Sequence, residues 1–327
     1  QTYNKETMLE YGWYGENATD VRTGYVNGIP TSGNDNSEGG MGKGGSQMMA
    51  YPTLFFDYDK DDQRRDVSVC NYGIVLSAKG NKYQMNTYNG MGVGKYRINW
   101  KKDMGATNSK RNINFPLLRY ADVLLMYAEA LNEVNNGPTQ EAINAVKEVR
   151  KRAFRGNEAK AAAGIPTNHD DFLTFIQKER KLELSNEGLR RTDLTRWGKQ
   201  YEMLMAEKQR LVNLAKRDGE FANVPVYRAY YLYPTPKFED PTIALSYIEL
   251  SQADVEALGL SADQIKTLKI LNSSSKGSLK DVKLYEKDGK LYSAVNKPEG
   301  AVEHSYTILN MFSIVSIKQK GNLCVER

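Results

Sequence analysis

NFPLLRYADVLLMYAEALNEVN, residues 114–135, is the stretch that decides the fold. Its apolar side chains recur at steps of three and four, which places them on one face of a helix. They are Leu117, Ala121, Leu124, Leu125, Ala128 and Leu131. Charged residues such as Arg119, Asp122 and Glu129 occupy the remaining surface. Because a helix with one apolar face needs a partner, we predict a packed helix over residues 117–134.

The partner follows immediately in the sequence. Asn136-Gly137-Pro138 is a turn signal, and Thr139 is a suitable N-cap for a second helix. We predict an antiparallel pair formed by residues 117–134 and 139–155, of the kind that stacks in tetratricopeptide-like arrays. The side chains expected between the two helices are Leu124, Leu125, Ala128, Val146 and Val149.

A third long helix is predicted from Asn168, with Asp171 as a capping-box acid. Its apolar face continues through Glu179 and Glu183, so two carboxylates lie one turn apart beside the core. A glycoside hydrolase needs two carboxylates on opposite sides of a sugar bond. Since these two point from one helix toward the core, we predict structural ion pairing instead of catalysis. The candidate partners are Arg119, Arg180, Arg190, Arg191 and Arg196.

Four segments together resemble the SusD/RagB family, nutrient-capture lipoproteins of the Bacteroidota outer membrane. They are DYDKDDQRRD (57–66), RYADVLLMYAEALNEV (119–134) with AINAVKEVRKRAF (142–154), FIQKERKLELSNEGLRRTDLTRWGK (175–199) and YLYPTPKFE (231–239). The resemblance covers roughly residues 50–240 and implies a binding protein without enzymatic activity. It also implies structural roles for Arg119, Asp122, Glu179, Glu183, Arg190, Arg191, Asp193 and Trp197.

The fold class we predict is mainly α, with tetratricopeptide-like helical hairpins, long irregular loops and a few short strands. Three segments are expected: a loop-rich, ligand-facing segment (1–115), a SusD/RagB-like helical scaffold (116–240) and a divergent C-terminal segment (241–327). The last should contain short helices over 251–258 and 261–268, a hairpin around Asp288-Gly289 and a strand over 311–317. The resemblance is to the C-terminal portion of a longer protein with an N-terminal helical half.

Composition excludes several classes of function. The net charge is +5 over 327 residues, and the cations are interspersed with acids, so we predict no nucleic-acid surface. Cys70, Cys324 and the two histidines are not at ligand spacing, so no zinc or iron site is predicted. The two cysteines can pair in an oxidising compartment, but a count of two decides nothing. Asp57, Asp59 and Asp61 form a D-x-D-x-D run, but the residues that follow do not match those that an EF-hand calcium loop requires.

Aromatic residues in the first loop are the candidate ligand site. YGWYG (11–15) sets Trp13 among glycines and tyrosines. Sugars stack their C–H faces on flat rings, so exposed aromatic rings on loops suit glycan capture. We predict ligand contacts by Trp13, Tyr11, Tyr14 and Tyr25, with Asn17, Asp20 and Arg22 as partners for sugar hydroxyls. Packing of these rings under the loop is the competing interpretation.

The resemblance implies an oligosaccharide-binding protein that passes its ligand to a SusC-like TonB-dependent transporter. It implies no cofactor, and a location on the extracellular face of the outer membrane through a lipid-anchored N-terminal Cys that this chain does not contain. Capture of peptides, as in the RagB branch, is the alternative within the family. A helical-repeat scaffold that binds only protein is the alternative from another class, and an enzyme is a distant third.

Overall fold

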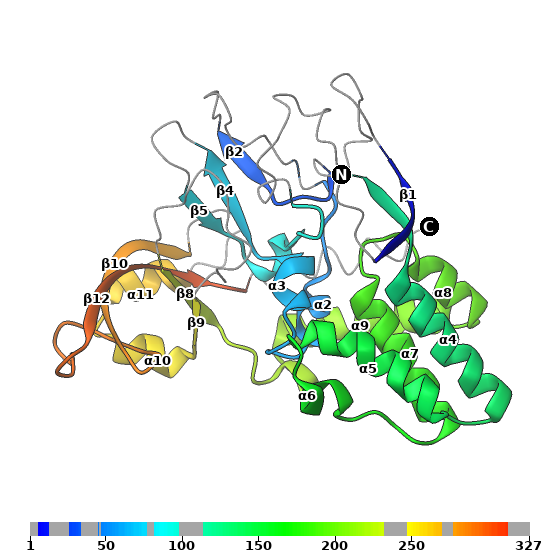
Figure 1. Cartoon of the computed structure of the whole chain (residues 1–327). Coiled ribbons are helices and arrows are strands. Elements are labelled where there is room, and N and C mark those ends of the chain that lie inside the picture. Colours follow the sequence, from blue (N-terminus) through cyan, green and yellow to red (C-terminus); the bar gives the residue numbers. More distant parts are fainter. Residues whose placement is uncertain are drawn as a thin grey trace.

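The computed structural model describes residues 6–12, 26–33, 45, 47–76, 82–97, 114–231, 247–269 and 277–312. In Figure 1 a helical unit lies on one side and a β-sheet with two short helices lies on the other. Short strands and helices from residues 31–93 lie between these two parts. The predicted mainly helical fold is confirmed, and the C-terminal sheet is larger than the sequence indicated.

The helical unit contains the predicted pair and the helices that follow it. Its elements are α4 (Tyr120–Asn135), α5 (Gln140–Ala153), α6 (Glu158–Ala162), α7 (His169–Glu183), α8 (Arg190–Arg196) and α9 (Gln200–Lys216). Asn136 ends α4 in the left-handed conformation at φ 51°, and the Thr139 hydroxyl accepts the Ala142 N–H at 3.2 Å. These caps reverse the chain within a few residues, so α4 and α5 form the predicted antiparallel hairpin.

One apolar core joins α4, α5 and α7. Its fully buried members include Leu125, Ala128, Val146, Phe172 and Ile176. Leu124 is only partly buried at the edge of this core. Helix α7 begins as predicted, because the Asn168 side chain accepts the Asp171 N–H at 3.0 Å.

The predicted start of the first helix is wrong. Leu117 lies in strand β7 (Phe115–Arg119) and is 48% exposed, so it does not belong to the apolar face. Strand β7 pairs antiparallel with β1 (Thr7–Tyr11), and Arg119 is still extended at φ −122° and ψ 153°. The ladder with β1 holds residues 115–119 straight, so the helix begins only at Tyr120. Because β1 is distant in the sequence, the pattern of residues 114–135 does not reveal this pairing.

The middle of the chain packs on the end of the helical unit. It consists of β2 (Thr31–Gly33), α2 (Pro52–Asp57), α3 (Arg64–Ser68), β3 (Val69–Cys70), β4 (Tyr72–Leu76), β5 (Lys82–Met85), η1 (Tyr88–Gly90) and β6 (Gly92–Val93). A second core gathers Phe55 of α2, Tyr88 of η1, Leu214 of α9 and Phe221 of η3 (Gly219–Phe221). This core fixes the middle segment against α9.

The C-terminal part forms a five-stranded antiparallel sheet. Its order is β11 (Lys290–Tyr292), β10 (Ser278–Lys287), β12 (Val302–Asn310), β8 (Tyr227–Tyr231) and β9 (Tyr247–Leu250). The predicted hairpin at Asp288-Gly289 joins β10 to β11, and both turn residues have positive φ as such turns require. Two short helices, α10 (Gln252–Ala257) and α11 (Ala262–Lys269), pack on this sheet near the predicted positions.

Only residues 311 and 312 of the strand predicted over residues 311–317 are described, and they do not form a strand. Strand β12 stops at Asn310, and residues 313–317 lie outside the described residues. Phe312 instead packs on Tyr88, with ring centroids 4.9 Å apart. The apolar side chain of Phe312 therefore reflects burial in the second core and not a strand.

Replacing Leu125 with Ala tests the helical core. Leu125 is fully buried between α4, α5 and α7, so the cavity should lower the free energy of unfolding by about 2–5 kcal/mol. Val134→Ala on the same helix is the control, because Val134 is 84% exposed and should change stability by less than about 0.5 kcal/mol. Urea unfolding measures both, and equal effects would contradict the packing described.

Candidate functional site

The predicted ligand residues belong to the first loop of the chain. Tyr11 ends β1 opposite Phe115 of β7 and is 57% exposed. Trp13, Tyr14 and Tyr25 lie outside the described residues. Ligand binding by these four aromatic residues therefore stays a prediction.

Ion pairs hold the start of strand β1 against the helical unit. The Glu6 carboxylate, directly before β1, accepts Arg119 Nη1 at 2.6 Å and pairs with Arg152 at 3.0 Å. The Glu6 carbonyl also accepts the Tyr120 N–H at 2.7 Å. Since Arg119 ends β7 and Arg152 lies in the last turn of α5, the beginning of the first loop is anchored to two elements of the scaffold.

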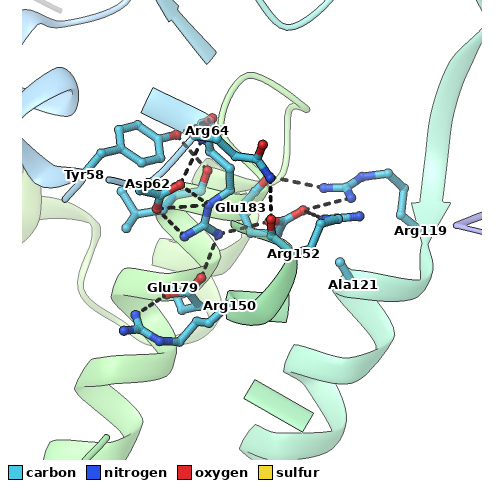
Figure 2. A network of polar contacts seen from close by, with 12 residues as sticks. Tyr58, Asp62, Arg64, Arg119, Ala121, Arg150, Arg152, Glu179 and Glu183 are labelled. Carbon is cyan, nitrogen blue, oxygen red and sulfur yellow. Dashed lines mark hydrogen bonds and ion pairs between the residues drawn. The ribbon is translucent and has the colours of Figure 1, made fainter. Parts of the chain in front are cut away.

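Glu179 and Glu183 form the centre of a buried ion-pair network (Figure 2). They are 2% and 4% exposed, and Arg64 lies between them. Arg64 Nη1 is 2.7 Å from Glu179 Oε1 and 3.0 Å from Glu183 Oε2. Arg150 adds a second cation to Glu179 at 3.3 Å, and Glu183 also pairs with Arg152. Both carboxylates are thus ion-paired inside the protein.

Their partners differ from the arginines nearest in sequence. Arg180 instead binds Asp122 at 2.7 Å and Asp193 at 2.9 Å. Residues next to each other on a helix point in different directions, so Arg180 faces α4 and α8 while Glu179 faces α3 and α5. Asp122 and Asp193 are buried partners of one arginine, whereas the helical pattern had placed Asp122 on the open surface.

Arg190, Arg191 and Trp197 lie apart from the two glutamates. Arg190 donates to the Gln177 carbonyl at 3.1 Å, and Arg191 is exposed with no ion pair to any described residue. Arg191 is therefore not one of the cations that pair with Glu179 or Glu183. Trp197 is half-buried, with the Arg196 guanidinium 4.5 Å from its ring and its Nε1 donating to Glu129 at 2.8 Å.

A third carboxylate completes the network at the end of α7. Glu187 binds Arg119 through both oxygens, at 2.7 and 2.8 Å. Lys95 pairs with Glu187 and donates to the carbonyls of Glu183 at 2.6 Å and Ser185 at 3.3 Å. A cation that binds the last carbonyls of a helix also interacts favourably with its dipole. Lys95 therefore fixes the segment that follows β6 to α7.

Burial and the neighbouring cations have opposite effects on the pKa of Glu183. Burial alone would raise the pKa of this carboxyl, but the cations of Arg152, Arg64, Lys95 and Arg119 outweigh it and lower the pKa to about 2. The neighbouring Tyr58 donates its hydroxyl to the Leu182 carbonyl at 2.8 Å, and burial raises its pKa to about 12. Near neutral pH the glutamate stays charged and the tyrosine stays neutral.

A cavity of about 320 Å³ lies against this network. Arg64, Lys95, Arg119, Arg152, Glu183 and Glu187 line it together with Tyr96 and Pro116. The network is thus not entirely enclosed, although its charged groups are already engaged with one another. Those ion pairs leave the charged walls little capacity for a further charged ligand.

The aspartates upstream of α3 are engaged by the protein. Asp57 pairs with Lys181 at 2.5 Å and Arg210 at 2.7 Å, and Asp61 pairs with Lys160. Within the described ranges, no group of three or more His, Cys, Asp or Glu side chains is placed to hold a metal ion. Asp62 orients Arg64 at 2.6 Å. Cys70 is buried in β3, and Cys324 lies outside the described residues.

Fold and network together define a helical-repeat scaffold held by internal ion pairs, with a two-stranded β-ribbon at one end. No helix in the described part is both long and apolar enough to cross a bilayer. The SusD family model matches residues 5–240, well over half of the chain. The chain belongs to the SusD family.

Individual relatives agree with this assignment. A SusD homolog of known structure from Bacteroides thetaiotaomicron is 30% identical, with a TM-score of 0.56 over 63% of this chain and 44% of its own. "SusD-like protein P2" from Formosa agariphila is 31% identical over 47% of this chain and 32% of its own. "SusD-like protein P38" from the same organism is 34% identical over 33% of this chain and 22% of its own. The chain spans a third or less of the length of these two curated relatives.

Replacing Glu179 with Ala tests the network. The change leaves Arg64 and Arg150 without their shared carboxylate, so unfolding should become easier by about 3–5 kcal/mol. The control is Glu158→Ala, because its pair with Lys151 is exposed and should add nothing measurable. Chemical denaturation compares the stabilities of the variants. A Glu179→Ala protein of unchanged stability would show that the ion pairs of Glu179 do not stabilise the fold.

The pH dependence of stability tests the charge on Glu183. A pKa lowered to about 2 means that its stabilisation is fully present above the unfolded pKa, roughly 4.3, and is lost as the pH falls toward 2. The loss is roughly 3 kcal/mol for this one group. We expect Glu183→Gln to be less stable at pH 7 and to have a flatter curve between about pH 5 and 2.

Glu303→Gln is the matched surface control: its pair with Lys283 is exposed and screened by solvent, so its removal should change the curve far less than Glu183→Gln. Unfolding free energies from urea titrations at each pH give the curves. An acid slope that Glu183→Gln leaves intact would contradict the role of this carboxylate.

Proposed function

We propose that the protein captures oligosaccharides on the extracellular face of the outer membrane and passes them to a SusC-like TonB-dependent transporter. The observation that carries this proposal is the SusD family match over residues 5–240. A lipid anchor on an N-terminal Cys of the full-length protein would hold it at the surface. Because the chain spans less than half of the solved relative, this activity is proposed for the whole protein.

The chemistry of the first loop supports capture of sugars. Tyr11 presents an exposed ring where β1 ends, and Trp13 and Tyr14 follow it among glycines in the sequence. A sugar ring placed on such side chains buries its C–H face while its hydroxyls remain available to Asn, Asp and Arg. Weak binding of this kind suits a protein that must release its ligand to a transporter.

The buried carboxylates support binding without cleavage. Hydrolysis of a glycosidic bond needs one carboxylic acid and one carboxylate on opposite sides of the sugar. Glu179 and Glu183 project from one helix and share Arg64, so no sugar bond fits between them. The low pKa of Glu183 also prevents it from acting as a general acid near neutral pH.

Trp13→Ala in the full-length protein tests the ligand site. Loss of one stacked ring is worth about 1–2 kcal/mol, so affinity for the oligosaccharide should fall about tenfold while the melting temperature hardly changes. The control is Tyr201→Ala, which removes a 78% exposed ring from α9 and should leave affinity unchanged. Isothermal titration against panels of polysaccharides and peptides measures both.

The panels also separate the alternatives. Heat with peptides and none with polysaccharides would overturn the choice of ligand, and release of shorter products would overturn the absence of catalysis. Unchanged affinity in Trp13→Ala would remove this residue from the site. A large loss of stability without a binding defect would mean that its ring packs under the loop.

A further inference from the structure

Arg228 of β8 is fully buried, and its charge is only partly matched. Its exposed fraction is 0%, and Nη2 donates to Glu249 Oε1 of the neighbouring strand β9 at 3.0 Å. The Nε and Nη1 nitrogens have no hydrogen-bond partner among the protein atoms. A buried donor without a partner costs roughly 1–3 kcal/mol, and more when it is charged, so these nitrogens require an explanation.

Aromatic rings surround the guanidinium and cannot supply the missing acceptor. Its central carbon lies 4.7 Å from the Phe55 ring centre, 4.5 Å from that of Tyr247 and 5.7 Å from that of Tyr88. Ring faces attract a cation, but they do not replace the hydrogen bonds that N–H groups make at their edges. The side chain is therefore shielded from water while its donors remain unused.

Tyr230 adds another unused donor beside it. It lies two residues along β8, on the same face of the sheet as Arg228. Its hydroxyl is buried and makes no well-formed hydrogen bond with a described residue, although it interacts with the Arg228 guanidinium. Burial raises the pKa of Tyr230, against the opposing effect of the Arg228 cation, so the hydroxyl keeps its proton. Two nitrogens and one hydroxyl thus share a buried location on one sheet face.

The one carboxylate that binds Arg228 is shared with a second cation. Glu249 also pairs with the exposed Lys60 at 3.6 Å, while Asp66 is engaged by Arg65 at 3.0 Å. The buried charge of Arg228 is therefore only partly matched by its neighbours.

We propose that a small monovalent anion of the halide class binds between Nε and Nη1 of Arg228 and the hydroxyl of Tyr230. A water molecule at this point would have to donate two hydrogens as well as accept. The two unused Arg228 nitrogens can only donate and the walls are ring faces, so a species that accepts fits them better. The anion supplies the acceptor that these nitrogens lack, beside the rings of α2 and η1.

Crystals of the full-length protein grown in sodium bromide test the site directly. We expect an anomalous bromide peak within hydrogen-bond distance of Arg228 Nε, Nη1 and the Tyr230 hydroxyl. In solution the melting midpoint should rise to a plateau with chloride or bromide, relative to sodium gluconate at the same ionic strength. Water density at this position together with a halide-independent midpoint would overturn the proposal.

Two conservative variants make the solution test specific. Tyr230→Phe removes one donor to the anion, so the halide concentration for half-maximal stabilisation should rise about tenfold. Tyr88→Phe is the matched control: its ring also faces Arg228, but its hydroxyl donates to the Pro225 carbonyl at 3.3 Å. Its halide dependence should equal that of the wild type. A Tyr230→Phe protein with unchanged halide dependence, or equal shifts in both variants, would overturn the assignment.

Discussion

The burial of Glu179 and Glu183 is the constraint on which the rest of the structure depends. Two carboxylates removed from water must be matched by cations, and the side chains that match them come from α3, α5 and β7. Each of these elements must therefore lie at a fixed place against α7. The apolar core of α4, α5 and α7 supplies most of the stabilisation. The ion pairs decide how the non-helical segments dock on it.

This constraint extends to the segments that lead into the loops. Glu6 before β1, and Lys95 after β6, each contact the network directly. The residues that follow them in sequence belong to the segments that we propose as ligand-facing. Ion pairs thus hold the described residues that precede these segments against the helical unit.

The sequence predicted the features that depend on residues close together in the chain. Helical periodicity and caps placed α4, α5 and α7 within a few residues, and the burial of two glutamates followed from their position on the α7 face. It identified Arg119 as a partner of Glu183, but it missed Arg64, which is 115 residues away in sequence from Glu179. The exposure of Leu117 and the extent of the C-terminal sheet were missed for the same reason. Both depend on strands that pair with distant segments.

The C-terminal sheet shows how a divergent segment joins a family scaffold. Strand β8 precedes residue 240, where the family match ends, yet it lies between β12 and β9, which follow that residue. One face of β8 packs Tyr227 and Ala229 toward α10 and α11, while the other directs Arg228 toward Phe55 and Tyr88. Alternation along a strand makes both contacts possible at once. A single strand thus connects the part of the chain beyond residue 240 to the core that also holds α9.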